Sequence, residues 1–172
     1  MLQLINAINT NYKSVSNYYR SFKYNMDELN SYALSLLGKS KKSYLDYIMY
    51  IEKDLYFLID DNNPDYIIGY GCIKHYNKYL KYTDEIGNIS YGVRKSERNK
   101  GYGTKILELL LEKCIENNIN EVFISCLKSN IASKKVIENN GGKLEKEFIN
   151  PIENSESLKY KIKLKEKVKI KK

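Results

Sequence analysis

The chain has 172 residues, of which 42% are hydrophobic, so it is long enough for one domain with a hydrophobic core and is not wholly disordered. Its net charge of +8 lies at one end, because Lys159–Lys172 contains eight lysines and one glutamate and leaves Met1–Leu158 with 21 basic and 20 acidic residues. No apolar run approaches the roughly 20 residues that cross a bilayer, and Met1–Thr10 lacks the pattern of a secretory signal. We therefore expect a single domain, residues 1–172, in the cytoplasm without a membrane partner.

Three scattered cysteines, Cys72, Cys114 and Cys126, are odd in number and form no closely spaced pair. This arrangement is typical of reduced thiols packed inside a cytosolic protein. We expect neither a disulfide framework nor a metal site.

The first third of the chain has a helical pattern. Apolar residues recur at helical spacing in Met26–Leu37, where Gly38 follows as a stop signal, and again in Tyr44–Ile51. The period then changes, since Leu55–Asp60 and Ile67–Lys74 are apolar runs separated by a turn-forming Asp61–Asp65 segment. These two runs predict a hairpin.

The remaining elements alternate between strand and helix patterns. Gly87–Val93 predicts a strand, and Tyr102–Asn117 predicts a helix with one charged and one apolar face. Further along the chain we expect, in order, a strand, a short helix and two strands: Glu121–Cys126, Asn130–Asn139, Leu144–Phe148 and a stretch from Leu158 onward with lysines on its solvent face. The order of elements predicts an α/β or α+β domain with a mixed central β-sheet flanked by helices.

The segment from Val93 to Thr104 lies between a predicted strand and the best predicted helix, and it contains two glycines. The first N–H groups of a helix have no partner within it, and the helix dipole favours negative charge there. Gly101 and Gly103 would allow a phosphate to reach those groups, while Arg98 and Lys100 add positive charge. The loop has neither a P-loop ending nor a third glycine in dinucleotide spacing. A pyrophosphate site and a plain tight turn both remain open.

The pattern Arg98-x-x-Gly101-x-Gly103 after a strand resembles the acyl-CoA motif of the GNAT superfamily of N-acetyltransferases, and Asn130–Gly142 resembles a second segment of that family. The resemblance covers about Leu55 to Phe148 and implies a GNAT-like fold, acetyl-CoA as co-substrate and direct transfer to a primary amine. It also implies a set of cofactor-binding residues: Tyr91 and Val93 on the strand, Arg98, Asn99, Lys100, Gly101, Tyr102, Gly103 and Thr104 in the loop, and Asn130 and Ser133 on the later helix.

Two positions depart from the pattern of the family. Asn88 stands where many members carry a carboxylate that takes the proton of the amine, and Ile137 stands where many carry a tyrosine that protonates the leaving thiolate. Glu85 and His75 are the nearby candidates for the base, and an unperturbed imidazole pKa of about 6.5 suits that task. An exposed loop acid and a turn histidine are the alternative interpretations.

Two other functions remain open from the sequence. The unusual residues at positions 88 and 137 leave room for a non-catalytic acyl-CoA-binding module. Nucleic-acid binding through the lysine-rich end is a weaker hypothesis, because no basic cluster with interleaved aromatic residues occurs elsewhere. We expect an amine substrate, small-molecule or peptide, and a homodimer is compatible with the sequence.

Overall fold

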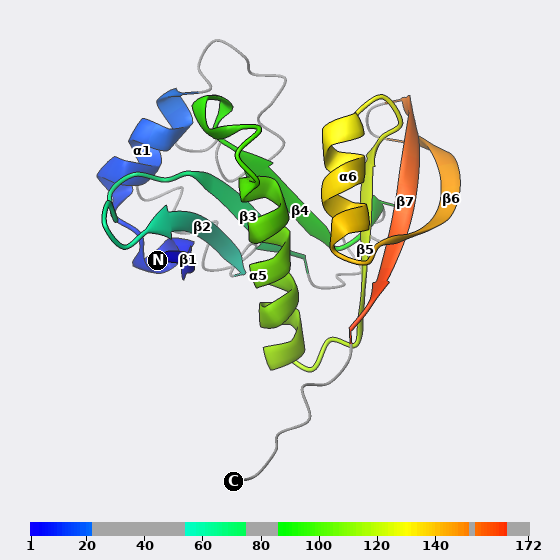
Figure 1. Ribbon diagram of the computed structural model, residues 1–172, viewed down its shortest axis with the longest axis horizontal. Helices are drawn as coiled ribbons and strands as arrows, with labels where there is room; N and C mark the ends of the chain where they lie inside the picture. The colour runs from blue at the N-terminus through cyan, green and yellow to red at the C-terminus, as the bar shows by residue number, and fades with distance from the viewer. Residues whose placement is uncertain (22–53, 75–85, 152–153, 165–172) are drawn as a thin grey trace, which may run out of the picture. The chain divides into compact units, whose positions relative to one another are not determined.

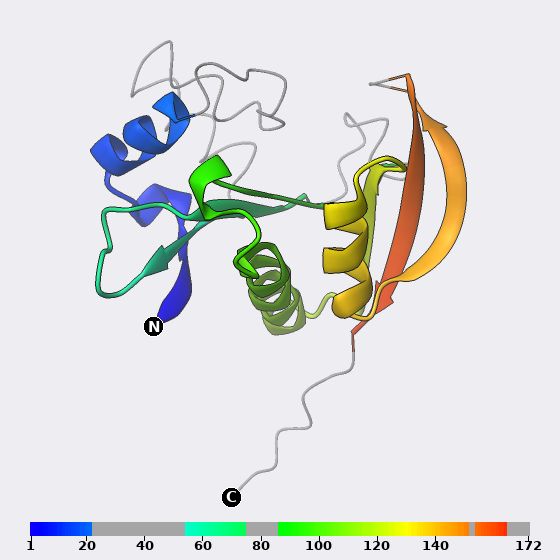
Figure 2. The same cartoon turned by 45° about the horizontal axis from the view of Figure 1, so that its top comes forward.

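The computed structural model describes residues 1–21, 54–74, 86–151 and 154–164 (Figures 1 and 2). The predicted helices at Met26–Leu37 and Tyr44–Ile51 lie outside these residues, as do His75, Glu85 and Lys165–Lys172. The chain divides into two compact units. Unit 1 comprises Met1–Ile73 and Tyr91–Ile106, and unit 2 comprises Lys74–Ser90 and Leu107–Lys172.

A four-stranded sheet has the order β1-β2-β3-β4, with β1 at Leu2–Asn6, β2 at Leu55–Asp60, β3 at Gly69–Ile73 and β4 at Ile89–Val93. The predicted hairpin is confirmed, because β2 and β3 pair antiparallel with Leu55 opposite Cys72. The sequence analysis expects a helical start and omits β1. Leu2–Asn6 becomes a strand by pairing antiparallel with β2, whose residues lie at least fifty positions away from their partners in β1, so no local pattern reveals the strand.

The core of unit 1 lies under a short 3₁₀ turn, η1 (Ala7–Asn9), and helix α1 (Tyr12–Arg20). Tyr18 of α1 is fully buried and meets the Phe57 ring edge-on at 6.0 Å between centroids. A glycine allows β3 and β4 to approach closely here, because a Cβ on Gly69 would lie 2.5 Å from the Gly92 carbonyl oxygen. The end of β4 is thereby fixed against the core.

Unit 2 contains a three-stranded antiparallel sheet in the order β5-β7-β6, made of β5 (Glu121–Leu127), β6 (Lys143–Asn150) and β7 (Ser155–Lys163). Helix α6 (Ile131–Asn139) runs alongside β5 and β7 in both views (Figures 1 and 2). Ile137 of α6 is fully buried, and the Tyr160 hydroxyl donates to Glu138 Oε1 at 3.3 Å. This hydrogen bond ties the helix to β7.

Strand β7 only partly follows the predicted alternation. Leu158, Tyr160 and Ile162 are buried as expected. The lysines were expected to face solvent, but Lys159 is only 7% exposed. Its Nζ lies 4.4 Å from the centroid of the Phe123 ring and 3.4 Å from Glu145 Oε2, so a cation–π contact and an ion pair hold the buried ammonium.

Helix α5 (Tyr102–Glu116) begins in unit 1 and continues in unit 2. Its predicted apolar face is confirmed as buried: Ile106, Leu107, Leu110, Leu111 and Cys114. No helix among the described residues is long and apolar enough to span a membrane. With three α-helices and two sheets in the described part of the chain, the predicted mixed α/β class is confirmed.

Candidate functional site

The segment that joins β4 to α5 is a tight loop of unit 1. After Val93 the chain forms a 3₁₀ turn, η4 (Lys95–Glu97), and then reverses so that α5 begins at Tyr102. Asn99 and Gly101 have left-handed backbone angles, with φ of 62° and 81°. Asparagine and glycine are the residues that adopt this conformation most easily, which explains their presence at these two positions.

The start of α5 has features that are common to helix N-termini that bind anions. The Lys105 N–H donates to the Gly101 carbonyl at 3.1 Å, which is the first hydrogen bond of the helix, and the N–H groups at a helix start point out of its N-terminal end. The space above Gly101 is open, since a Cβ built there would touch no atom within 4 Å. The N–H groups of a helix start, the open space above Gly101 and the positive end of the helix dipole are together compatible with a bound phosphate or pyrophosphate.

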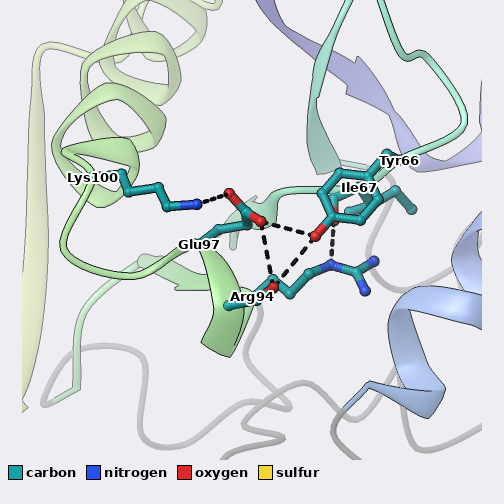
Figure 3. Close-up of polar contacts among 6 residues, drawn as sticks. Tyr66, Ile67, Arg94, Glu97 and Lys100 are labelled. Carbon is teal, nitrogen blue, oxygen red and sulfur yellow. Dashed lines mark hydrogen bonds and ion pairs between the residues drawn. The ribbon is translucent and has the colours of Figure 1, made fainter.

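Two basic side chains of the loop have defined partners. Arg98 Nε donates to the Val93 carbonyl at 3.3 Å, which ties the loop to the end of β4. Lys100 Nζ lies 2.9 Å from Glu97 Oε2 (Figure 3). The other oxygen of that carboxylate, Oε1, accepts a hydrogen bond from the Tyr66 hydroxyl at 2.9 Å.

These contacts keep both members of the Lys100–Glu97 pair charged. The hydrogen bonds from Lys100 and Tyr66 lower the pKa of the Glu97 carboxyl, and the hydrogen bond to Glu97 raises the pKa of the Lys100 ammonium. The carboxyl pKa is lowered, so the pair is complete above the usual pKa of a glutamate and is lost only as the pH falls through the lowered value. The arrangement is therefore fully present near neutral pH.

Arg94, the residue after β4, fastens the loop to the rest of unit 1. Its Nε donates to the Ile67 carbonyl at 2.8 Å (Figure 3), and its backbone N–H donates to Ile68. The guanidinium lies 5.0 Å from the centroid of the Tyr18 ring and 4.5 Å from that of Tyr66. Two aromatic faces and a carbonyl thus fix the base of the loop.

The remaining predicted CoA contacts, Asn130 and Ser133, lie in unit 2. The Asn130 side chain caps α6 by accepting the Ser133 N–H at 3.0 Å. The Ser133 hydroxyl also hydrogen-bonds the Cys126 thiol, whose pKa is raised chiefly by burial. A thiol in this state is a poor nucleophile near neutral pH, which argues against Cys126 as an acyl carrier.

Asn88 precedes β4 and is hydrogen-bonded to β5, and both Asn88 and β5 belong to unit 2. Its side-chain Oδ1 accepts the Phe123 N–H at 2.8 Å, while its own backbone N–H donates to the Phe123 carbonyl at 2.9 Å. Its carbonyl also accepts from the Lys74 N–H at 2.7 Å. The amide at this position is therefore a structural link between the start of β4 and the middle of β5.

Removing this link should destabilise the protein measurably. In Asn88→Ala the half-buried Phe123 N–H loses its acceptor, which typically costs about 1–3 kcal/mol of unfolding free energy. Asn88→Asp keeps an acceptor oxygen of the same reach and should stay within about 0.5 kcal/mol of the wild type. Urea unfolding followed by circular dichroism gives both values, and equal stability of Asn88→Ala and the wild type would contradict the structural role.

The structure brings the loop residues Arg98–Thr104 together with Tyr91 and Val93 in unit 1, and it brings Asn130 and Ser133 together in unit 2. The two proposed bases, His75 and Glu85, lie outside the described residues. The roles of Tyr66, Glu97 and Arg94 in this site were not predicted from the sequence. No local pattern could have revealed Tyr66, because it meets Glu97 across 31 positions of the chain.

The comparisons with known proteins agree with this geometry. The model of the acetyltransferase (GNAT) family matches residues 17–141, which is well over half of the chain. The protein therefore belongs to the GNAT family and is an acetyltransferase. It is also 30% identical to the uncharacterized protein YxbD of Bacillus subtilis (strain 168) over 108 residues, which cover 59% of this chain and 67% of YxbD.

Solved structures share the fold at low sequence identity. A ribosomal-protein-S5-alanine acetyltransferase from Vibrio fischeri superposes with a TM-score of 0.72 and 14% identity, over 95% of this chain and 92% of that one. RimL, a ribosomal L7/L12 alpha-N-protein acetyltransferase in complex with coenzyme A, superposes with a TM-score of 0.68 and 14% sequence identity. The match covers 95% of this chain and 94% of that one. A GNAT-family acetyltransferase from Bacillus anthracis superposes with a TM-score of 0.69 and 14% sequence identity, over 94% of each chain.

Proposed function

We propose that the chain binds acetyl-CoA at the β4–α5 loop and transfers the acetyl group to a primary amine. The observation that carries this proposal is the loop itself, with its left-handed Asn99 and Gly101, open space above Gly101 and the amide-rich start of α5. The backbone amides from Asn99 to Thr104 hold the pyrophosphate. Arg98 and Lys100 supply positive charge beside it.

The pantetheine arm of the co-substrate extends along β4. Among the described strands, β4 ends the order of its sheet, so one edge can accept an added strand. Tyr91 and Val93 offer backbone groups to the arm. The Val93 carbonyl accepts Arg98 Nε at a long 3.3 Å, and a carbonyl oxygen has a second lone pair for another donor. The resemblance to the family also assigns Asn130 and Ser133 of α6 to co-substrate binding.

Acetyl-CoA supplies an activated thioester, and the protein contributes mainly by holding the two reactants in line. Orientation of this kind can supply a large part of the barrier reduction. The amine attacks as the neutral base, so its ammonium proton must leave before or during attack. As the new C–N bond forms, the C–S bond of the thioester breaks and CoA leaves as the thiolate. We propose that Glu85 or His75 receives that proton, because Asn88 is an amide engaged with Phe123.

Two measurements test the proposal together. Calorimetry with CoA should show binding with a micromolar Kd, or about −8 kcal/mol. An acetyl-CoA assay against a polyamine, an amino acid, an aminoglycoside, a peptide with a free N-terminus and a protein lysine should then identify the acceptor. The peptide is included because the V. fischeri neighbour and RimL carry names of enzymes that act on ribosomal proteins.

The outcomes are distinct. Absence of CoA binding would refute the proposed site. Tight CoA binding without transfer to any amine of the panel would favour the acyl-CoA-binding alternative, which the residues at positions 88 and 137 suggested from sequence.

A further inference from the structure

Glu97 is a carboxylate beside a site built for anions, and its position requires an explanation. It ends η4, only four residues before Gly101, so its negative charge lies close to the N-terminus of α5 in sequence. A free carboxylate there would compete with a phosphate for the helix amides, because both are anions that helix N-termini bind. In this structure the carboxylate is held by other groups.

Both oxygens of Glu97 have donors. Oε1 accepts the Tyr66 hydroxyl at 2.9 Å and lies 3.4 Å from the Ser96 hydroxyl, while Oε2 accepts Lys100 Nζ at 2.9 Å (Figure 3). Lys100 and Ser96 belong to the same loop as Glu97. Tyr66 comes from the segment between β2 and β3, so among the described donors to Glu97 it is the one that ties the carboxylate to a separate part of unit 1.

The ion pair alone is a weak restraint. The Lys100 side chain is 53% exposed, and exposed pairs of long side chains contribute little to a fixed geometry. The Tyr66 ring, in contrast, is anchored because the Arg94 guanidinium stacks on it at 4.5 Å, and Arg94 is itself bonded to the Ile67 carbonyl. The hydroxyl of an anchored ring gives the carboxylate a fixed partner.

We propose that Tyr66 is a positioning residue for the phosphate loop. Through its hydroxyl it holds Glu97 against Lys100, which keeps the carboxylate away from the amides at the start of α5 and sets the position of the Lys100 ammonium. This inference rests on the proposed CoA site. It assigns a specific function to a residue outside the motif.

Tyr66→Phe tests the proposal because it removes the hydroxyl and keeps the ring that Arg94 contacts. The Kd for CoA, measured by calorimetry, should rise about three- to fivefold because the loop is then less preorganised for binding. The KM for acetyl-CoA should rise with it, while kcat at saturating acetyl-CoA should stay within about twofold, because the change affects co-substrate binding and not the transfer step.

Tyr56→Phe is the matched control. Tyr56 is a tyrosine of the same unit whose hydroxyl also donates to a carboxylate, Asp54 Oδ1 at 3.1 Å, and it lies on β2, outside the β4–α5 loop. Its removal should leave the Kd for CoA unchanged. A similar loss of CoA affinity in both variants would show a general effect of losing a tyrosine hydroxyl and would overturn the proposal.

A double-mutant cycle tests whether the hydroxyl acts through Glu97. In a Glu97→Ala background the Tyr66→Phe change should no longer alter the Kd for CoA, because the hydroxyl then has no carboxylate to hold. An undiminished effect of Tyr66→Phe in that background would overturn the mechanism, and so would tighter CoA binding by Tyr66→Phe alone. If the wild type bound no CoA, the proposed function would fail first, so the two failures are distinguishable.

Discussion

Replacing Gly103 with tryptophan should weaken CoA binding by at least about tenfold, equivalent to about 1.4 kcal/mol. Gly103 is the second residue of α5 and lies in the turn whose N–H groups precede the first helical hydrogen bond at Lys105. A large side chain at this point would occupy space that a pyrophosphate needs in order to reach the amides. A helix accepts a tryptophan more readily than a glycine, so the fold should persist.

The control for this change is Glu108→Trp, which puts the same side chain on an exposed position of the same helix beyond its first turn. It should bind CoA as the wild type does. Calorimetry measures both Kd values, and circular dichroism confirms that each variant is folded. Unchanged CoA affinity in a folded Gly103→Trp protein would mean that the phosphates do not bind at the start of α5.

The elements that the sequence predicts well are those whose pattern is complete within a short window. The buried residues of α5 recur every three or four positions. Gly101 precedes the helix and has a left-handed φ that would strain a residue with a side chain. The β2–β3 hairpin is likewise visible from two apolar runs on either side of a turn. The loop of the candidate site falls between such elements, which is why its position was predictable.

Features that depend on distant pairing were not predictable. Strand β1 exists because it pairs with β2, and Lys159 is buried because Phe123 and Glu145 meet it from neighbouring strands. The same holds for the Tyr66–Glu97 contact. The residue types of Lys159, Tyr66 and Glu97 suggest exposed side chains without a fixed partner. Only the folded structure shows which distant residues they contact.

Asn88 shows how a family pattern and a structure answer different questions. The resemblance indicates that a carboxylate is common at this position, so the sequence could only report that the usual base is missing. In the structure the amide has a structural role, since Asn88 Oδ1 accepts the Phe123 N–H. The backbone of Asn88 also donates to the Phe123 carbonyl and accepts from the Lys74 N–H. In the proposed reaction, the acceptor amine must therefore lose its proton to another group or to solvent.

We expect Glu85→Gln or His75→Gln to lower kcat by at least about thirtyfold, since a general base typically contributes about 100- to 10,000-fold. Each variant keeps a side chain of hydrogen-bonding type but loses the group that takes a proton. The KM for acetyl-CoA should change by no more than about threefold, because the base acts on the amine and not on the co-substrate. Steady-state kinetics with the acceptor from the amine panel measures both constants.

The pH dependence separates the two candidates. The logarithm of kcat/KM for the acceptor rises with pH until the base, or the amine itself, has lost its proton. An unperturbed imidazole has a pKa of about 6.5, so an inflection near that pH that disappears in His75→Gln would assign the base to His75. If both variants retain wild-type kcat, neither residue is the base. Transfer would then depend on positioning and on the neutral fraction of the amine, and acceptors with a low pKa, such as a peptide α-amine at about 7.7–8.0, should react faster than lysine at about 10.4.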